Sequence, residues 1–226
     1  KLVHATPGFV GVEISIPFTD EEKEYRQQHD LLETSTSQSK VFYGKSAHAS
    51  HPTLGSNAIV GMMDYLAQLP DGIAILNLDG GVNFNSVPDS AMLEIDMVGD
   101  FKETIITKIK KVMNALKGME KDFTNYPSEG FDPQIPTMNI GLIDTFEDHI
   151  RMTGSCRIPP SVTEEVYQNW MTQMKESCDS VGSVFRISEY KPSLETSVES
   201  DFVNSCQEEL GKMDLPGDLT KSPVNT

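Results

Sequence analysis

A histidine in a loop of small residues is the side chain best placed for chemistry in this sequence. His48 follows a predicted strand, within the run Gly44-Lys45-Ser46-Ala47-His48-Ala49-Ser50-His51-Pro52. Its small neighbours leave the imidazole clear of the backbone, where it can donate a hydrogen bond to a developing oxyanion or a substrate carboxylate. The alternative, an ordinary surface histidine, stays open. His51, three residues further on, is expected to have no role.

Two further polar residues are candidates for binding a carboxylate. Arg157 lies on the solvent-facing side of a predicted strand, just before Pro159, and its guanidinium can hold a carboxylate through two parallel hydrogen bonds. Asn85 begins the run Asn85-Ser86-Val87-Pro88, which follows Gly80-Gly81. Taken singly, Arg157 is also compatible with a solvated strand arginine and Asn85 with a turn residue.

Metal ligation has weak support in the sequence. Asp20-Glu21-Glu22 has the letters of a metal motif, but these acids begin a predicted helix and complement the positive end of its dipole. We favour the second interpretation. The five histidines show no ligand spacing of the His-x-Asp or His-x-x-x-His kind, so we expect no metal site in this chain alone.

Composition excludes several classes of partner. The 226 residues include 34 acids and 18 bases, for a formal net charge of −16. Nucleic acid and anionic membranes are bound through basic surfaces, so neither is an expected partner. No apolar run approaches the roughly 18 residues of a membrane-spanning helix. Three widely separated cysteines argue against a disulfide scaffold and indicate a reducing, cytoplasmic setting.

Strands and helices follow one another along the whole chain. Predicted strands cover residues 8–18, 40–43, 73–78, 91–98, 138–143, 150–158 and 184–190. Predicted helices cover residues 20–30 and 57–69, and further helices begin near Asp100, Ser161 and Ser200. The expected caps are the pairs Thr19/Glu22, Asp100/Glu103 and Ser161/Glu164, and Gly118 is the expected stop of the third helix.

The alternation within the strands predicts the fold class. Between residues 91 and 98 the side chains that face one way are Ala91, Leu93, Ile95 and Met97, and those that face the other are Glu94 and Asp96. A strand of this kind has one wet face, so helices should cover only the other face. We therefore predict an α+β open-faced sandwich with a mostly antiparallel sheet.

A strand-strand-helix unit occurs twice in the predicted order. Leu93 and Met97 correspond to Met152 and Cys156, at an offset of 59 residues, while Glu103 and Glu164 are 61 apart. This pattern indicates a weak internal duplication, although two similar units also arise by chance in α+β folds.

Several of these motifs together resemble the lid, or dimerisation, domain of the dinuclear zinc peptidases and deacylases. That family contains acetylornithine deacetylase, succinyl-diaminopimelate desuccinylase, aminoacylase, glutamate carboxypeptidase and carnosinase-like dipeptidases. The resemblance is sharpest over residues 44–59, where Gly, His, Pro and Gly precede Asn57-Ala58-Ile59. It extends through Asn85-Ser86-Val87-Pro88-Asp89, Thr137-Met138-Asn139-Ile140-Gly141 and Arg157-Ile158-Pro159-Pro160.

The resemblance implies a ferredoxin-like lid and a role for each candidate. His48 would reach a catalytic centre and polarise the scissile carbonyl, while Asn85 and Arg157 would hold the carboxylate end of a small-molecule substrate. Two zinc ions of the parent enzyme would activate water. The family's zinc ligands lie before the lid and near the C-terminus, and this chain contains neither set, so we expect the chain alone to be inactive.

The resemblance also implies a division of the chain. Residues 1–37 would lead into the lid, residues 38–190 would form it, and residues 191–226 would return toward a missing catalytic domain. The lid would support a homodimer, or its two units would form a pseudo-dimer within one chain. The rival reading is a non-catalytic α+β module for ligand binding or oligomerisation.

Overall fold

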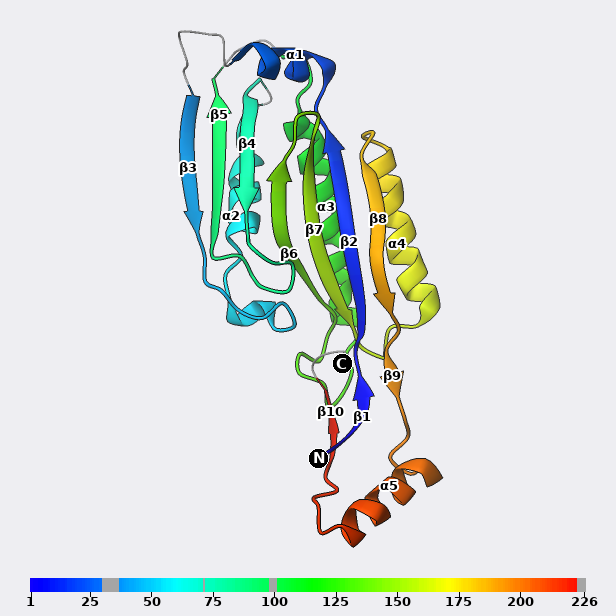
Figure 1. Ribbon diagram of the computed structural model, residues 1–226. Helices are drawn as coiled ribbons and strands as arrows, with labels where there is room; N and C mark the ends of the chain where they lie inside the picture. Colours follow the sequence, from blue (N-terminus) through cyan, green and yellow to red (C-terminus); the bar gives the residue numbers. More distant parts are fainter. Residues whose placement is uncertain (30–36, 71, 98–100, 223–226) are drawn as a thin grey trace.

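A seven-stranded antiparallel sheet dominates the computed structural model, which describes residues 1–29, 37–70, 72–97 and 101–222. The strand order is β3-β5-β4-β6-β7-β2-β8, and every neighbouring pair is antiparallel (Figure 1). The strands are β2 (Gly8–Pro17), β3 (Ser37–Tyr43), β4 (Ala74–Gly80), β5 (Ser90–Asp96), β6 (Thr137–Thr145), β7 (His149–Ile158) and β8 (Val184–Lys191).

Three helices cover one face of this sheet (Figure 1). They are α2 (Ala58–Leu66), α3 (Ile105–Asp122) and α4 (Glu164–Asp179). The predicted apolar stripe of α3 is buried in full, and alternate residues of β2 and β7 face the helices to complete the core. The α+β open-faced sandwich is therefore confirmed: period-2 alternation leaves the second face of the sheet polar and uncovered.

The large sheet consists of two units that share a strand-strand-helix path, β4-β5-α3 in the first and β6-β7-α4 in the second. Unit A contains β3, α2, β4, β5 and α3, and its strands lie in the order first-third-second. Unit B contains β2, β6, β7, α4 and β8, and its strands lie in the order second-third-first-fourth. Unit B thus has the four-strand order of a ferredoxin-like sheet with one helix, whereas unit A has two helices but lacks the fourth strand that would pair with β3. The units join where Gly80 of β4 pairs with Ile143 of β6.

The helix caps strengthen the duplication, although they differ from the predicted ones. Helix α3 begins after Thr104 and α4 after Thr163, whose side chain accepts the N–H of Val166. The two caps are 59 residues apart, the same offset as Leu93 and Met152. Because α4 begins after Thr163, the expected cap formed by Ser161 and Glu164 was wrong. The Ser161 hydroxyl instead donates to the carbonyl of Tyr126 at 2.8 Å. Asp100 lies outside the described residues.

Two other expectations were wrong for local reasons. Helix α3 continues through Gly118 to Asp122, because its apolar stripe extends to the buried Met119. Met97 follows the end of β5 and is 55% exposed, whereas Asp96 is 2% exposed. Asp96 is buried because its carboxylate accepts hydrogen bonds from Tyr25 at 2.7 Å and His29 at 3.0 Å.

The remaining elements lie at the two ends of the large sheet. Helix α1 (Asp20–His29) crosses one end, and a second sheet of β1 (Leu2–Thr6), β9 (Leu194–Glu195) and β10 (Leu219–Lys221) continues from the other, followed by α5 (Asp201–Lys212) (Figure 1). The short 3-10 helices η1 (Pro52–Leu54) and η2 (Phe123–Asn125) complete the fold. None of the helices in the described ranges is both long and apolar enough to cross a membrane.

Candidate functional site

The loop that carries His48 connects β3 to α2 and is closed at its base. Lys45 and Ser56 exchange two backbone hydrogen bonds of 2.9 Å, so the intervening residues form a compact excursion. A Cβ on Gly44 would lie 2.0 Å from the Ser56 carbonyl oxygen, which explains the glycine at that position. The loop buries Ala49 and Ser50 and leaves His48 exposed, as the small neighbours of the histidine predict.

The turn that carries Asn85 runs antiparallel to this loop. The N–H of Ala49 donates to the Asn85 carbonyl and the N–H of Val87 to the Ala47 carbonyl, both at 2.8 Å. His48 and Ser86 thereby form an isolated β-bridge. The Asn85 side chain is half-buried, and its buried Oδ1 has no hydrogen-bond partner within the described part of the chain. The structure therefore brings His48 and Asn85 side by side.

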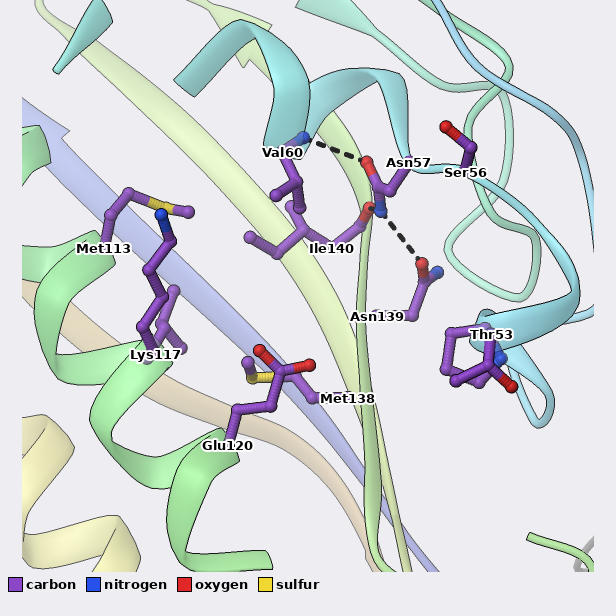
Figure 2. Close-up of a pocket in the computed structure, with 12 residues that line it drawn as sticks. Thr53, Ser56, Asn57, Val60, Met113, Lys117, Glu120, Met138, Asn139 and Ile140 are labelled. Atoms are coloured by element: carbon purple, nitrogen blue, oxygen red, sulfur yellow. Dashed lines mark hydrogen bonds between the residues drawn. The ribbon is translucent and has the colours of Figure 1, made fainter. Parts of the chain in front are cut away.

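Two asparagines hold both segments against unit B. Asn139 of β6 is buried, and its Nδ2 donates to the Ser86 carbonyl at 2.9 Å. Asn57 caps α2 through a 3.1 Å bond from the Val60 N–H, and its Nδ2 donates to Asn139 Oδ1 at 3.1 Å (Figure 2). The sequence analysis gave neither asparagine a role. The N-cap position of Asn57 was a recognisable signal, but its bond to a residue 82 positions away was not.

Arg157, the penultimate residue of β7, lies on the unit B side of the same region. Its guanidinium carbon lies 4.6 Å from the centroid of the Phe9 ring, and the Phe9 and Phe84 rings are 6.4 Å apart. Burial lowers the pKa of Arg157, and Glu189 partly opposes the shift. Arg157 and Ser50 line one small crevice, so the arginine borders the loop that carries His48. All three predicted site residues therefore gather where unit A meets unit B.

The acidic run at residues 20–22 serves helix termini. Glu22 is 2% exposed, and its Oε2 accepts the N–H of Thr19 at 2.9 Å. Its Oε1 accepts the N–H of Ile105 at 2.8 Å, which adds a cap to α3. These bonds support the helix-cap interpretation. Within residues 1–29, 37–70, 72–97 and 101–222, no group of three or more His, Cys, Asp or Glu side chains could hold a metal ion.

A separate cavity of about 380 Å³ lies between η1, α2, α3 and β6 (Figure 2). Apolar side chains of Val60, Met113 and Met138 line it, with Glu120 at the rim. Lys117, also at the rim, forms an ion pair with Asp64. None of the three predicted site residues lines this cavity. Sequence analysis missed it because its walls come from four elements far apart in the chain.

Comparison with known protein families matches one part of the chain. Residues 35–123, which include every helix and strand of unit A, match the family model of the peptidase dimerisation domain. No curated protein sequence matches the chain.

The chain is similar to several solved structures at low sequence identity. The aminoacylhistidine dipeptidase of Vibrio alginolyticus is 11% identical, with a TM-score of 0.63 over 97% of this chain and 52% of that one. The dipeptidase Dug1p of Saccharomyces cerevisiae is 10% identical over 100% and 44%, with a TM-score of 0.40. The aminopeptidase PepT of Bacillus cereus is 15% identical over 99% and 40%, at 0.32. The first match shows a shared fold, and the chain spans about half the length of that structure.

Proposed function

Because residues 35–123 match the family model of the peptidase dimerisation domain, we propose that this chain is the lid portion of a metal-dependent hydrolase. The substrates would be dipeptides or N-acyl amino acids, whose amide bond is cut and whose carboxylate the lid holds. The observation that carries the proposal is the meeting of the loop with His48 and the turn with Asn85 at their 2.8 Å backbone bonds, beside Arg157. One donor and two carboxylate-binding groups at one place suit this class of substrate.

Each side chain has a distinct task in this proposal. The exposed His48 ring donates an N–H to the scissile carbonyl oxygen, which gains negative charge in the transition state. The guanidinium carbon of Arg157 lies over the Phe9 ring, 4.6 Å from its centroid. This contact orders the guanidinium before substrate arrives, so it can bind the carboxylate with little loss of entropy. Asn85 contributes its side-chain amide to the same end of the substrate.

Zinc ions would supply the activated water, and residues outside this chain would hold them. Among the described residues, no three or more His, Cys, Asp or Glu side chains are grouped so that they could hold a metal ion. We predict that the chain as given binds zinc weakly and shows no amidase activity. Metal analysis and an assay with N-acyl amino acids and dipeptides test this prediction. Tight stoichiometric zinc with turnover would contradict it and would return Asp20-Glu21-Glu22 to consideration.

The lobe formed by β1, β9, β10 and α5 is the proposed return toward a catalytic domain. An open apolar groove on this lobe is lined by Leu2, Phe202, Leu210 and Met213, and both Phe202 and Met213 are exposed. Apolar side chains gathered in this way favour contact with another protein surface. This placement leaves residues 1–37 and 191–226 as connections, although β2 within the first segment lies inside the large sheet.

Assembly through the lid is proposed in one of two forms. The pairing of β4 with β6 already joins two similar units within one chain, so a monomer with an internal pseudo-dimer is one form. The other is a homodimer through an outer strand, β3 or β8. Val41 on β3 and Val184 on β8 are each 46% exposed. Sedimentation measures the oligomeric state of the wild-type protein and of the variants Val41→Lys and Val184→Lys. The variant that dissociates a dimer identifies the edge strand that pairs, and a monomeric wild-type protein excludes the homodimer.

The test of the proposed function is His48→Ala in the full-length enzyme. We expect kcat to fall about 100- to 1,000-fold, because one preorganised donor to a developing oxyanion contributes about that much. Folding stability should fall by about 1–2 kcal/mol, because the ring is exposed but its loss leaves the buried Ser50 hydroxyl and N–H without their acceptor. His149→Ala is the matched control, because His149 pairs with Asp148 at the far end of β7. Turnover within a few fold of wild type, with zinc still bound, would favour the rival non-catalytic module.

A further inference from the structure

A chain of three hydrogen-bonded side chains lies within the loop that carries His48. The hydroxyl of Ser50 is 2.7 Å from Nδ1 of His48 and 2.9 Å from Nδ1 of His51. The backbone N–H of Ser50 also donates to Nδ1 of His48 at 3.1 Å. Ser50 is 2% exposed, and Nε2 of His51 lies 3.8 Å from the exposed carboxylate of Asp132.

The backbone bond fixes the direction of every other bond in the chain. Since Nδ1 of His48 accepts the Ser50 N–H, that nitrogen carries no proton in the neutral ring. The Ser50 hydroxyl must then donate its single hydrogen to His48, which leaves its oxygen to accept from His51. His51 consequently carries a proton on Nδ1, and the proton of neutral His48 resides on Nε2.

We propose that Ser50 and His51 are positioning residues, which hold the His48 imidazole as its Nε2–H tautomer with that N–H on the far side of the ring from the loop. This inference rests on the proposed function, because an Nε2–H donor on the free side of the ring is what a carbonyl-polarising histidine requires. Ser50 does not touch substrate; it acts through His48. His51, which the sequence analysis left without a role, completes the chain by ordering the serine hydroxyl.

The first test reads the tautomers directly in the chain as given. Long-range ¹H–¹⁵N correlation spectra of the imidazoles, recorded where both rings are neutral, should show His48 protonated on Nε2 and His51 protonated on Nδ1. Ser50→Ala should remove the acceptor for His51 and move its proton to Nε2, while Ser50→Thr should retain the wild-type pattern. Ser46→Ala, in the same loop at an exposed position, is the matched control. A wild-type His48 protonated on Nδ1, or a His51 tautomer unchanged by Ser50→Ala, overturns the proposal.

The second test measures turnover in the full-length enzyme. Ser50→Ala should lower kcat about 10-fold with little change in KM, the scale typical when a supporting partner of a functional histidine is removed. His51→Asn, whose amide can still donate to Ser50, should retain more activity than His51→Ala. One outcome is that both Ser50→Ala and His48→Ala keep wild-type turnover while the tautomers shift as expected. This result overturns the proposed function and supports the positioning role of Ser50. Another outcome is that Ser50→Ala keeps wild-type turnover while His48→Ala loses most of its turnover. This result overturns the positioning role alone.

Discussion

Units A and B share a strand-strand-helix path, β4-β5-α3 in one and β6-β7-α4 in the other, but they contribute different things to the candidate site. In unit A, a nine-residue turn (81–89) joins β4 to β5, and a long loop (44–57) joins β3 to α2. In unit B, β6 and β7 are joined by three residues, 146–148. Unit A therefore supplies the loops with His48 and Asn85, while unit B supplies the strand that ends at Arg157.

The difference shows how a duplicated fold can build one site from two dissimilar copies. The turn of unit A lies across β6 of unit B, where Asn139 donates to Ser86 and the backbone of Phe84 closely approaches Gly141. A rigid strand positions a side chain well, and a long loop can reach across a boundary between units. We call this contact of the turn 81–89 with β6 the seam between the units. The candidate site depends on the seam more than on either unit alone.

The largest effect on the seam is expected from Gly141→Ala. A Cβ at this position would lie 2.4 Å from Cα of Phe84, and backbone cannot yield as a flexible side chain does. We expect a loss of about 3 kcal/mol in the free energy of unfolding, measured by denaturant titration, at the upper end of overpacking effects. Gly118→Ala is the control: its Cβ would meet nothing within 4 Å, and helix propensity should raise stability by about 1 kcal/mol. Equal stability of the two variants would mean that the seam is loose.

Arg157→Gln tests the contribution of unit B to substrate binding. In the full-length enzyme we expect KM for a carboxylate-bearing substrate to rise about 10- to 100-fold, since hydrogen bonds to charged groups contribute about 1.5–3 kcal/mol. Arg151→Gln is a matched control on the same strand. Its guanidinium lies 4.5 Å from the centroid of the Phe146 ring, as that of Arg157 lies over Phe9, but it pairs with Asp144 instead. A similar rise in KM for both variants would remove Arg157 from the site.

The smallest expected effect is a change in the pH dependence of stability at β8, the fourth strand of unit B, which has no counterpart in unit A. In unit B, the rings of Tyr167 on α4 and Tyr190 on β8 stack at 4.7 Å, and burial raises the pKa of Tyr167 from 10.0 to about 12. The neutral phenol is favoured in the folded state, so its stabilising contribution is complete below pH 10 and is lost as pH rises through 12. The free energy of unfolding, measured by denaturant titration at pH values from 9 to 12, should therefore fall as pH rises. In Tyr167→Phe this fall should be smaller by about 1–2 kcal/mol. An identical slope in both proteins would show that Tyr167 ionises freely.

Much of the architecture was predictable because it depends on local periodicity. Apolar residues at helical spacing gave the buried face of α3, and alternation gave β7, since both signals require only that one face meet a core. Thr19/Glu22 was recognised as a cap because both partners are three residues apart. The second bond of Glu22, to Ile105 across 83 positions, leaves no trace in sequence spacing.

The sequence by itself determined which residues are chemically able to act: an exposed imidazole among small residues, an arginine at a strand end and an asparagine in a turn. Tertiary structure decided that they meet, because units A and B join through β4 and β6 and the Asn57–Asn139 bond ties loop to strand. Tertiary structure also gave His51 a proposed role. Sequence spacing assigned it none, but in the structure the Ser50 hydroxyl links it to His48. Periodicity records which face of an element is buried, whereas hydrogen bonds between distant segments depend on the relative placement of whole units.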